Sequence, residues 1–312
     1  MELRKDYVLD RWVIINPKRG ERPHQFVHKD NPAGVKKCFF CPGNENLTPM
    51  ELGRVGSEKR WLITWFLNKF PAVQADGDYN VRTDNNYFTF SSSYGWHEVI
   101  VETGKHKKQL FDLPEKHLME LMKVYQQRLN EVRRKEGIKF VSLFKNHGPD
   151  AGTSIEHSHS QVIGYNIVPP VINEKLGRSL SHGRCAYCDI INIERGSFRR
   201  CFENEKFVAF TPYASRFNYE IWLFPKEHLV DFASLDEEHL RQFLDIFRKI
   251  LGRLKKLGCS FNFYFQNYGQ LHFHVEFCPR ISLWAGFEFS TDTIINSVSP
   301  EDAASFYRGK KQ

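Results

Sequence analysis

The residues with the clearest chemical potential lie in one short segment, His157-Ser158-His159-Ser160-Gln161. Glycines shortly before it permit tight turns that expose backbone N–H groups, and nearby amide and hydroxyl side chains add neutral donors for a phosphate. A neutral imidazole beside such a cradle can attack phosphorus and form a phosphoramidate, which a second phosphate ester then reverses. We therefore predict that His159 is the nucleophile of a double displacement. The predicted phosphate contacts are Asn146, Gly152, Ser154 and Gln161.

Each half of the chain also carries ligands for a metal ion. A Cys-x-x-Cys pair places two thiolates on one tight turn, and it occurs twice, followed each time by histidines in equivalent places. Tetrahedral zinc accepts two thiolates and two imidazoles, and four protein ligands leave no open position. We predict two structural zinc ions per chain; the alternative is buried thiols and core imidazoles without metal. The predicted ligands are Cys38, Cys41, His106 and His157 in the first half, and Cys185, Cys188, His228 and His272 in the second.

These landmarks belong to an internal repeat, whose offset is constant from Glu98 through the helix that follows His106. Glu98 and His106 in the first half correspond to Glu220 and His228 in the second, since 220 − 98 = 122 and 228 − 106 = 122. Apolar residues spaced by three and four predict a helix near residues 118–129 and its counterpart 122 residues later, each followed by a β-rich run.

The repeat predicts an α+β fold of two tandem units that share a mostly antiparallel sheet with flanking helices. We expect the first unit to span residues 1–178 and to hold the His-x-His-x-Gln segment. The second unit, 179–312, is expected to hold the second metal site. The expected joint follows Pro169-Pro170, where proline, glycine and polar residues interrupt the apolar pattern.

Composition narrows the class of protein. The 44 Lys and Arg residues exceed the 37 Asp and Glu residues, which gives a net charge of +7, but the basic residues are scattered rather than gathered in one block. No apolar run reaches the ~18 residues that a membrane span needs, and the first residues do not resemble a targeting signal. We expect a cytoplasmic protein that binds anionic small molecules and neither nucleic acid nor membrane.

The His-x-His segment resembles the signature of the galactose-1-phosphate uridylyltransferase family, a branch of the histidine-triad superfamily. The pattern Phe-x-Asn-x-Gly-x3-Gly-x-Ser-x-x-His-x-His-x-Gln is complete from Phe144 to Gln161. The resemblance implies that His159 becomes uridylylated, that His157 ligates zinc, and that Gln161 steadies the phosphate. It also implies two histidine-triad-like units and a homodimer.

Two further segments extend the resemblance. The run from Asn16 to Pro23 is similar to the family's Ser-Pro-x-Arg-x-x-Arg-Pro, which implies that Arg19 and Arg22 hold the phosphate of the incoming sugar phosphate. Arginine suits this task because its guanidinium presents a rigid fork of donors. The segment that starts at Asn68 resembles the one that lines the nucleoside.

Three functional hypotheses follow. The leading one is exchange of UMP between UDP-glucose and galactose 1-phosphate. In the second, ADP-glucose is cleaved by inorganic phosphate, because His157-Ser158-His159 and the second Cys-x-x-Cys pair resemble the plant ADP-glucose phosphorylase members of the family. The third, from another class, is a zinc-ribbon nucleic-acid-binding protein, which predicts steep salt dependence of binding.

Overall fold

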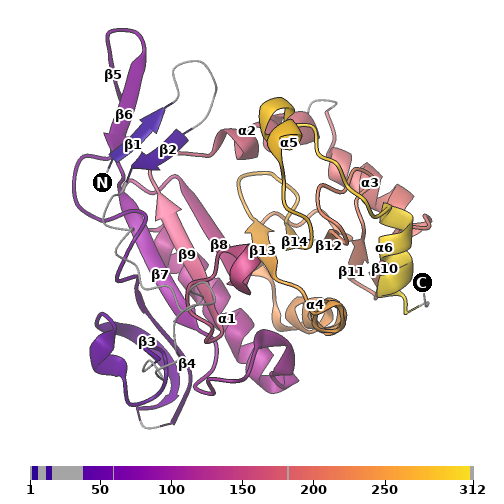
Figure 1. Cartoon of the computed structure of the whole chain (residues 1–312), viewed down its shortest axis with the longest axis horizontal. Coiled ribbons are helices and arrows are strands. Elements are labelled where there is room, and N and C mark those ends of the chain that lie inside the picture. The colour runs from indigo at the N-terminus through magenta and orange to yellow at the C-terminus, as the bar shows by residue number, and fades with distance from the viewer. Residues whose placement is uncertain (1, 6–11, 16–37, 59, 181–182, 310–312) are drawn as a thin grey trace. The chain divides into compact units, whose positions relative to one another are not determined.

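The computed structural model describes residues 2–5, 12–15, 38–58, 60–180 and 183–309 (Figure 1). The chain forms two compact units. Unit 1 comprises Met1–Gln109, Glu120–Leu143 and Ser154–Gly177, and unit 2 comprises Leu110–Met119, Phe144–Thr153 and Arg178–Gln312. The expected division into residues 1–178 and 179–312 stays a proposal.

Unit 1 is built on four long antiparallel strands. They pair in the order β3 (Glu51–Ser57), β4 (Arg60–Leu67), β7 (Gly95–Val101) and β9 (His159–Tyr165). Val99, Ile100 and Val101 on β7 are all buried, as a continuous run of β-branched residues in a strand covered on both faces predicts. The register places Val101 opposite His159 and Val99 opposite Gln161, so one face of β7 lies beside the predicted nucleophile.

A smaller sheet in unit 1 contains β1 (Glu2–Lys5), β2 (Trp12–Ile15), β5 (Arg82–Asp84) and β6 (Phe88–Ser92), in the order β2-β1-β6-β5. Figure 1 shows these strands grouped at one end of unit 1, away from β3 and β4. The short 3-10 helix η2 (Glu45–Leu47) follows the first Cys-x-x-Cys turn.

Unit 2 repeats this plan. Its strands pair antiparallel in the order β10 (Arg200–Glu203), β11 (Phe207–Phe210), β12 (Ile221–Pro225), β14 (His274–Pro279) and β13 (Phe261–Gln266). Strand β8 (Phe140–His147) contributes residues to both units, and its last four residues pair with β13.

The predicted helices are confirmed as α1 (Glu115–Arg133) and α4 (Glu237–Leu257). Helix α4 begins at the side chain of Asp236, which accepts the backbone N–H of His239, and ends at Gly258 in the left-handed region. Its apolar stripe, which includes Phe243 and Phe247, is fully buried among the phenylalanines of β13. Tertiary packing of this stripe, more than helix propensity, stabilises such a helix. No helix among the described residues is both long and apolar enough to cross a bilayer.

The segment expected to be an irregular joint is instead a helix, α2 (Pro170–Leu180). Proline is compatible with the first helical position because its missing N–H has no intrahelical partner there. Ile172 and Ser179 are buried and anchor the helix despite its polar composition and Gly177. Other helices in the described part of unit 2 are α3 (Ala186–Arg195), α5 (Gly286–Thr291) and α6 (Pro300–Tyr307), with the 3-10 helices η3 (Leu110–Asp112), η4 (Pro149–Ala151) and η5 (Phe232–Ser234).

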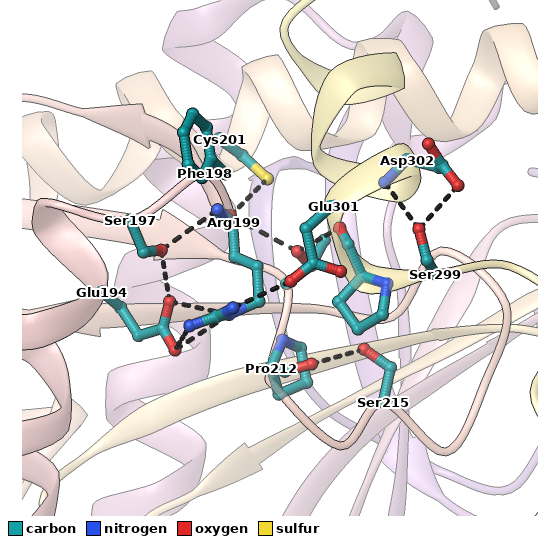
Figure 2. A network of polar contacts seen from close by, with 12 residues as sticks. Glu194, Ser197, Phe198, Arg199, Cys201, Pro212, Ser215, Ser299, Glu301 and Asp302 are labelled. Carbon is teal, nitrogen blue, oxygen red and sulfur yellow. Dashed lines mark hydrogen bonds and ion pairs between the residues drawn. The ribbon is translucent and has the colours of Figure 1, made fainter.

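An arginine ties α3 to α6 within unit 2, as Figure 2 shows. The guanidinium of Arg199 lies 2.9 Å from Glu194 on α3 and 2.8 Å from Glu301 on α6. Helix α6 itself begins at Ser299, whose hydroxyl accepts the backbone N–H of Asp302. These contacts link the C-terminal helix to α3, which carries Cys188 and begins after Cys185. The expected α+β fold with antiparallel sheet and flanking helices is thus confirmed.

Candidate functional site

The four predicted ligands of the first metal site converge in unit 1. The ligand atoms of Cys38, Cys41, His106 and His157 all lie within 4.8 Å of one another. The Nδ1 atom of His157 is 3.6 Å from the Cys38 sulfur and 3.7 Å from the Cys41 sulfur, and His106 Nδ1 is 3.4 Å from Cys41. Zinc bond lengths and a tetrahedral angle give a sulfur–nitrogen separation of about 3.6 Å. The donor set and its spacing therefore fit a zinc ion.

Hydrogen bonding selects the tautomer that such a site needs. His157 Nε2 lies 2.6 Å from the carbonyl oxygen of Thr103, so Nε2 carries the proton and Nδ1 presents its lone pair to the cysteines. Burial and the neighbouring Cys41 raise the pKa of the Cys38 thiol to about 11 in the protein without metal. A dication at this position would favour the thiolate.

The second predicted set converges in the same way in unit 2. The ligand atoms of Cys185, Cys188, His228 and His272 lie within 4.8 Å of one another, and His228 and His272 are each 3.5 Å from the Cys188 sulfur through Nδ1. His272 Nε2 is 2.9 Å from the carbonyl of Pro225, which repeats the arrangement of His157 and Thr103. Burial lowers the pKa of His272 to about 4, which keeps the ring neutral and able to bind metal.

His159 is oriented by the chain that holds the first cluster. Its Nδ1 lies 2.8 Å from the carbonyl oxygen of His157, two residues before β9, which begins at His159 itself. A carbonyl can only accept, so Nδ1 carries the proton and the lone pair of the neutral ring is on Nε2. The ring of Phe40, on the first Cys-x-x-Cys turn, meets His159 edge-on with centroids 5.3 Å apart. His159 thus contacts one predicted metal ligand, His157, and one residue of the turn that carries the two cysteines.

A buried carboxylate, that of Glu102, binds the two serines that flank His159 at the start of β9. Glu102 is fully buried and accepts hydrogen bonds from the hydroxyls of Ser158 and Ser160, on either side of His159. The hydroxyl of Tyr125 on α1 also donates to it over 3.0 Å. Burial and the charge of Glu102 raise the pKa of Tyr125 well above its usual value, so the phenol stays a donor. The sequence analysis did not identify this group.

Gln161 and Asn68 are brought together, with His97 between them. The side-chain oxygen of Gln161 lies 2.9 Å from His97 Nε2 and 3.5 Å from the amide nitrogen of Asn68. Because alternate residues of a strand share one face, Gln161 and His159 project from the same side of β9. His97 was not among the predicted residues. Its signal in the sequence is its alternation with Val99 and Val101 on a strand that pairs with β9.

The loop of residues 146–152, which contains Gly148 and Gly152, belongs to unit 2, and Asn262 of the same unit holds it in place. Asn262 on β13 donates its amide to the side-chain oxygen of Asn146 over 2.8 Å and to the carbonyl of Ala151 over 2.9 Å. Gly152 closes the 3-10 helix η4 (Pro149–Ala151) in the left-handed region, with φ 80°. A side chain is strained in that conformation, which accounts for glycine there.

The remaining predicted contacts are placed as follows. Ser154 is buried in unit 1, just before the His-x-His segment. Arg19 and Arg22 lie outside the described residues. A pocket of about 130 Å³ in unit 1 is lined by Phe40 and Phe66 on its apolar side and by polar residues that include Arg54.

The second His-x-His differs from the first in its third partner. His274 bonds through Nδ1 to the carbonyl of His272 over 2.8 Å, as His159 does to His157, but its Nε2 lies 3.3 Å from a carboxylate oxygen of Glu276. Arg216 and Tyr264 also donate to that carboxylate, over 2.9 and 2.7 Å. Glu276 groups with Glu220 and Cys278 as three potential metal ligands, and the Arg216 guanidinium, 2.9 Å from Glu276 and 3.7 Å from Glu220, offsets only one of the two carboxylate charges.

Comparison with known proteins shows the family to which the chain is similar. The sequence profile of the galactose-1-phosphate uridyl transferase N-terminal domain matches residues 1–169. An Arabidopsis thaliana protein named ADP-glucose phosphorylase is 30% identical over 98% of this chain and 92% of its own. A Thermotoga maritima galactose-1-phosphate uridylyltransferase is 27% identical over 97% of this chain and 96% of its own.

A solved structure extends the likeness to three dimensions. The crystal structure of the Arabidopsis thaliana ADP-glucose phosphorylase with bound ADP-glucose superimposes with a TM-score of 0.79 at 28% identity, and each chain is covered over 100% of its length. The profile match covers more than half of the 312 residues, and the plant relative spans nearly all of them. On these grounds the chain belongs to the galactose-1-phosphate uridylyltransferase family.

Proposed function

We propose that the protein is a nucleotidyltransferase that moves a nucleoside monophosphate from a nucleotide sugar to a phosphate-bearing acceptor through covalent attachment to His159. One observation carries the proposal: His159 Nδ1 is bonded to the carbonyl of His157, which leaves the lone pair of the neutral ring on Nε2. An activated nucleophile of this kind divides one displacement into two easier ones. Membership of the family supports the same chemistry.

In the first step, His159 Nε2 attacks the α-phosphorus of the nucleotide sugar. An N–P bond forms, the bridging P–O bond breaks, and hexose 1-phosphate leaves with the electron pair. In the second step, a phosphate oxygen of the acceptor attacks the same phosphorus and the N–P bond breaks, which returns neutral His159. Gln161 donates its amide to the phosphoryl oxygens, where charge develops. Arg19 and Arg22 hold the acceptor phosphate in this proposal, and Asn68, Asn146, Gly152 and Ser154 complete the substrate contacts.

Zinc is the proposed metal at both clusters, one ion in each half. With four protein ligands the ion has no open position, so it supplies rigidity rather than a bound water. At the first cluster the ion would also hold the nucleophile in place, because the carbonyl oxygen of its ligand His157 accepts a hydrogen bond from Nδ1–H of His159. We further propose a cytoplasmic homodimer.

The leading donor is UDP-glucose, with galactose 1-phosphate as the acceptor. The pocket lined by Phe40 and Phe66 supports a nucleoside beside the nucleophile, because Phe40 also contacts the His159 ring. A second candidate is adenylyl transfer from ADP-glucose to inorganic phosphate, which yields ADP and glucose 1-phosphate. It is favoured by the similarity to the plant relative, which is named for that activity and whose structure contains ADP-glucose.

Covalent labelling tests the proposal. The protein is mixed with UDP-glucose or ADP-glucose that carries 32P at the α-phosphate, without acceptor, and is then denatured in alkali, under which a phosphoramidate survives. We expect label on wild-type protein from one donor and none on His159→Asn with its zinc content unchanged. Label from UDP-glucose supports the leading candidate, and label only from ADP-glucose replaces it with the second.

Wild-type protein that takes up label from neither donor would refute nucleotidyl transfer from these sugars. The zinc-ribbon hypothesis makes the opposite prediction: tight, salt-sensitive binding of RNA by a protein inert towards nucleotide sugars.

A further inference from the structure

His97 lies at the centre of a hydrogen-bonded chain in unit 1 that ends at Gln161. The ring is only 2% exposed and occupies β7, one strand away from the nucleophile. Its Nδ1 lies 2.9 Å from the backbone nitrogen of Ala72, and its Nε2 lies 2.9 Å from the side-chain oxygen of Gln161. The ring therefore links the backbone N–H of Ala72, whose direction is fixed, to the side-chain amide of Gln161. The orientation of that amide determines whether it can donate or accept a hydrogen bond at the site.

The backbone N–H of Ala72 fixes the tautomer of His97. A backbone nitrogen can only donate, so His97 Nδ1 must accept and the ring proton must be on Nε2. An imidazolium would direct a second N–H against the N–H of Ala72. His97 Nε2–H consequently donates, and the Gln161 atom that receives it is the carbonyl oxygen.

A second backbone donor fixes the orientation of Asn68. The N–H of Phe70 donates to the side-chain oxygen of Asn68 over 2.9 Å, so the Asn68 nitrogen faces the other way. That nitrogen lies 3.5 Å from the Gln161 oxygen and 3.1 Å from His97 Nε2. The assignment of the His97 proton therefore rests on the N–H of Ala72, and with that proton on Nε2 the Gln161 oxygen is the acceptor that His97 and Asn68 share.

The consequence concerns the other end of the Gln161 side chain. With its oxygen held by His97, Gln161 presents its amide nitrogen, which has two N–H donors, toward the face of β9 that carries His159. In the flipped orientation, a carbonyl oxygen would face the phosphoryl oxygens and repel them. Because the two orientations have nearly the same shape, the hydrogen bonds of Gln161 must distinguish them.

We propose that His97 is a positioning residue that holds the Gln161 amide in the orientation that donates to the transferred phosphoryl group. The inference rests on the proposed nucleotidyl transfer through His159 and adds to it the residue that orients the phosphate donor. His97 acts through Gln161 and does not itself contact the substrate.

The matched variants are His97→Asn and His97→Gln. An asparagine oxygen can replace Nδ1 as the acceptor for Ala72, but asparagine is too short to donate to Gln161. A glutamine nitrogen can replace Nε2 as the donor. The rate of covalent labelling is measured in single turnovers with saturating nucleotide sugar, for these variants, for Gln161→Ala and for His97→Asn combined with Gln161→Ala. Zinc content and thermal unfolding of each variant serve as folding controls.

We expect His97→Asn to slow labelling by about tenfold to a hundredfold, as small misplacements of catalytic groups do, and His97→Gln to restore most of the rate. In the Gln161→Ala background, the His97→Asn change should cost less than about twofold, because its partner is gone. An equal loss in both backgrounds, or full activity of His97→Asn, would overturn the proposal.

The tautomer is measured separately, from the imidazole 15N resonances of the wild-type protein. We expect His97 to carry its proton on Nε2; a proton on Nδ1 would overturn the proposal whatever the activity. If wild-type protein is never labelled, the proposed transfer fails, and this spectrum still decides whether His97 orients Gln161.

Discussion

Breaking the ion pair between Glu98 and Arg128 should destabilise unit 1 strongly. The guanidinium of Arg128 on α1 makes two hydrogen bonds to the Glu98 carboxylate on β7, of 2.7 and 2.9 Å. The two side chains are 4% and 1% exposed, so water cannot replace either partner. Burial alone would lower the pKa of Arg128, but the hydrogen bonds and charge of Glu98 outweigh it and raise that pKa. Because a guanidinium is not deprotonated in proteins, Arg128 stays charged when Glu98 is changed.

The perturbation is Glu98→Gln, which keeps the shape but leaves one acceptor oxygen and turns an N–H group toward the guanidinium. A hydrogen bond to a charged group contributes about 1.5–3 kcal/mol, and loss of one partner of a buried pair costs about 3–5 kcal/mol. Since Arg128 keeps a second carboxylate in Glu131, we expect a loss of about 3 kcal/mol.

Thermal and urea unfolding of the zinc-loaded protein measure this change. A loss of that size lowers the melting temperature by on the order of 10 °C in a domain of this size. The matched control is Glu131→Gln, because Glu131 is 46% exposed and an exposed pair contributes below about 1 kcal/mol. Replacement of both partners, Glu98→Leu with Arg128→Met, should recover most of the stability. Equal effects of Glu98→Gln and Glu131→Gln would refute the reasoning.

Three further outcomes are expected. Cys41→Ser and Cys188→Ser should each remove about one zinc ion per chain by metal analysis, but only Cys41→Ser should slow labelling of the folded protein about a hundredfold, because the first cluster orients His159; equal slowing would contradict this. Chelator competition between pH 6 and 8 should show zinc affinity at the first cluster rising at least about tenfold per pH unit, since burial raises the pKa of Cys38 to about 11 and binding must release that proton; pH-independent affinity would be inconsistent with it. Asn262→Leu should release the loop at Asn146 and Ala151 and increase its hydrogen–deuterium exchange, whereas unchanged exchange would exclude Asn262 as its anchor.

The repeat made most of the fold predictable from the sequence. A constant offset of matching landmarks identified two similar units, and apolar spacing located helices α1 and α4 to within a few residues. The two groups of candidate metal ligands could also be predicted from the sequence, because Cys-x-x-Cys and His-x-His spacings reflect the geometry of a tetrahedral ion. Helix α2 was not predicted, because proline and glycine residues such as Pro170 and Gly177 usually interrupt helices. The burial of Ile172, which anchors this helix, cannot be seen in the sequence.

Residues that act through strand pairing could not be found in this way. His97 and Gln161 are 64 residues apart in the sequence, and their contact depends on the register of β7 against β9. Glu102 reads as an ordinary charged residue after a strand, yet it is fully buried and binds the serines that flank His159. Sequence spacing reveals ligands of a common ion, but it carries no information on which side chains a sheet register places together.

The two His-x-His segments share the hydrogen bonds of their histidines but differ in the residue that follows. In both, the first histidine donates Nε2–H to a backbone carbonyl and directs Nδ1 toward the cysteines. The second histidine donates Nδ1–H to the carbonyl oxygen of the first. The segments diverge at the third position. Gln161 is neutral and is held by His97, whereas Glu276 accepts from Arg216 and Tyr264 and places an oxygen 3.3 Å from His274 Nε2.

That carboxylate has two effects on the second segment. It draws a proton to Nε2, the atom that would have to attack phosphorus, and its charge repels a phosphate from the same face. A histidine that follows a ligand of a Cys2His2 cluster is therefore insufficient for the proposed nucleotidyl transfer. The third residue must be neutral, and its amide must be oriented, which is why we place the chemistry at His159 alone and assign the orienting role to His97.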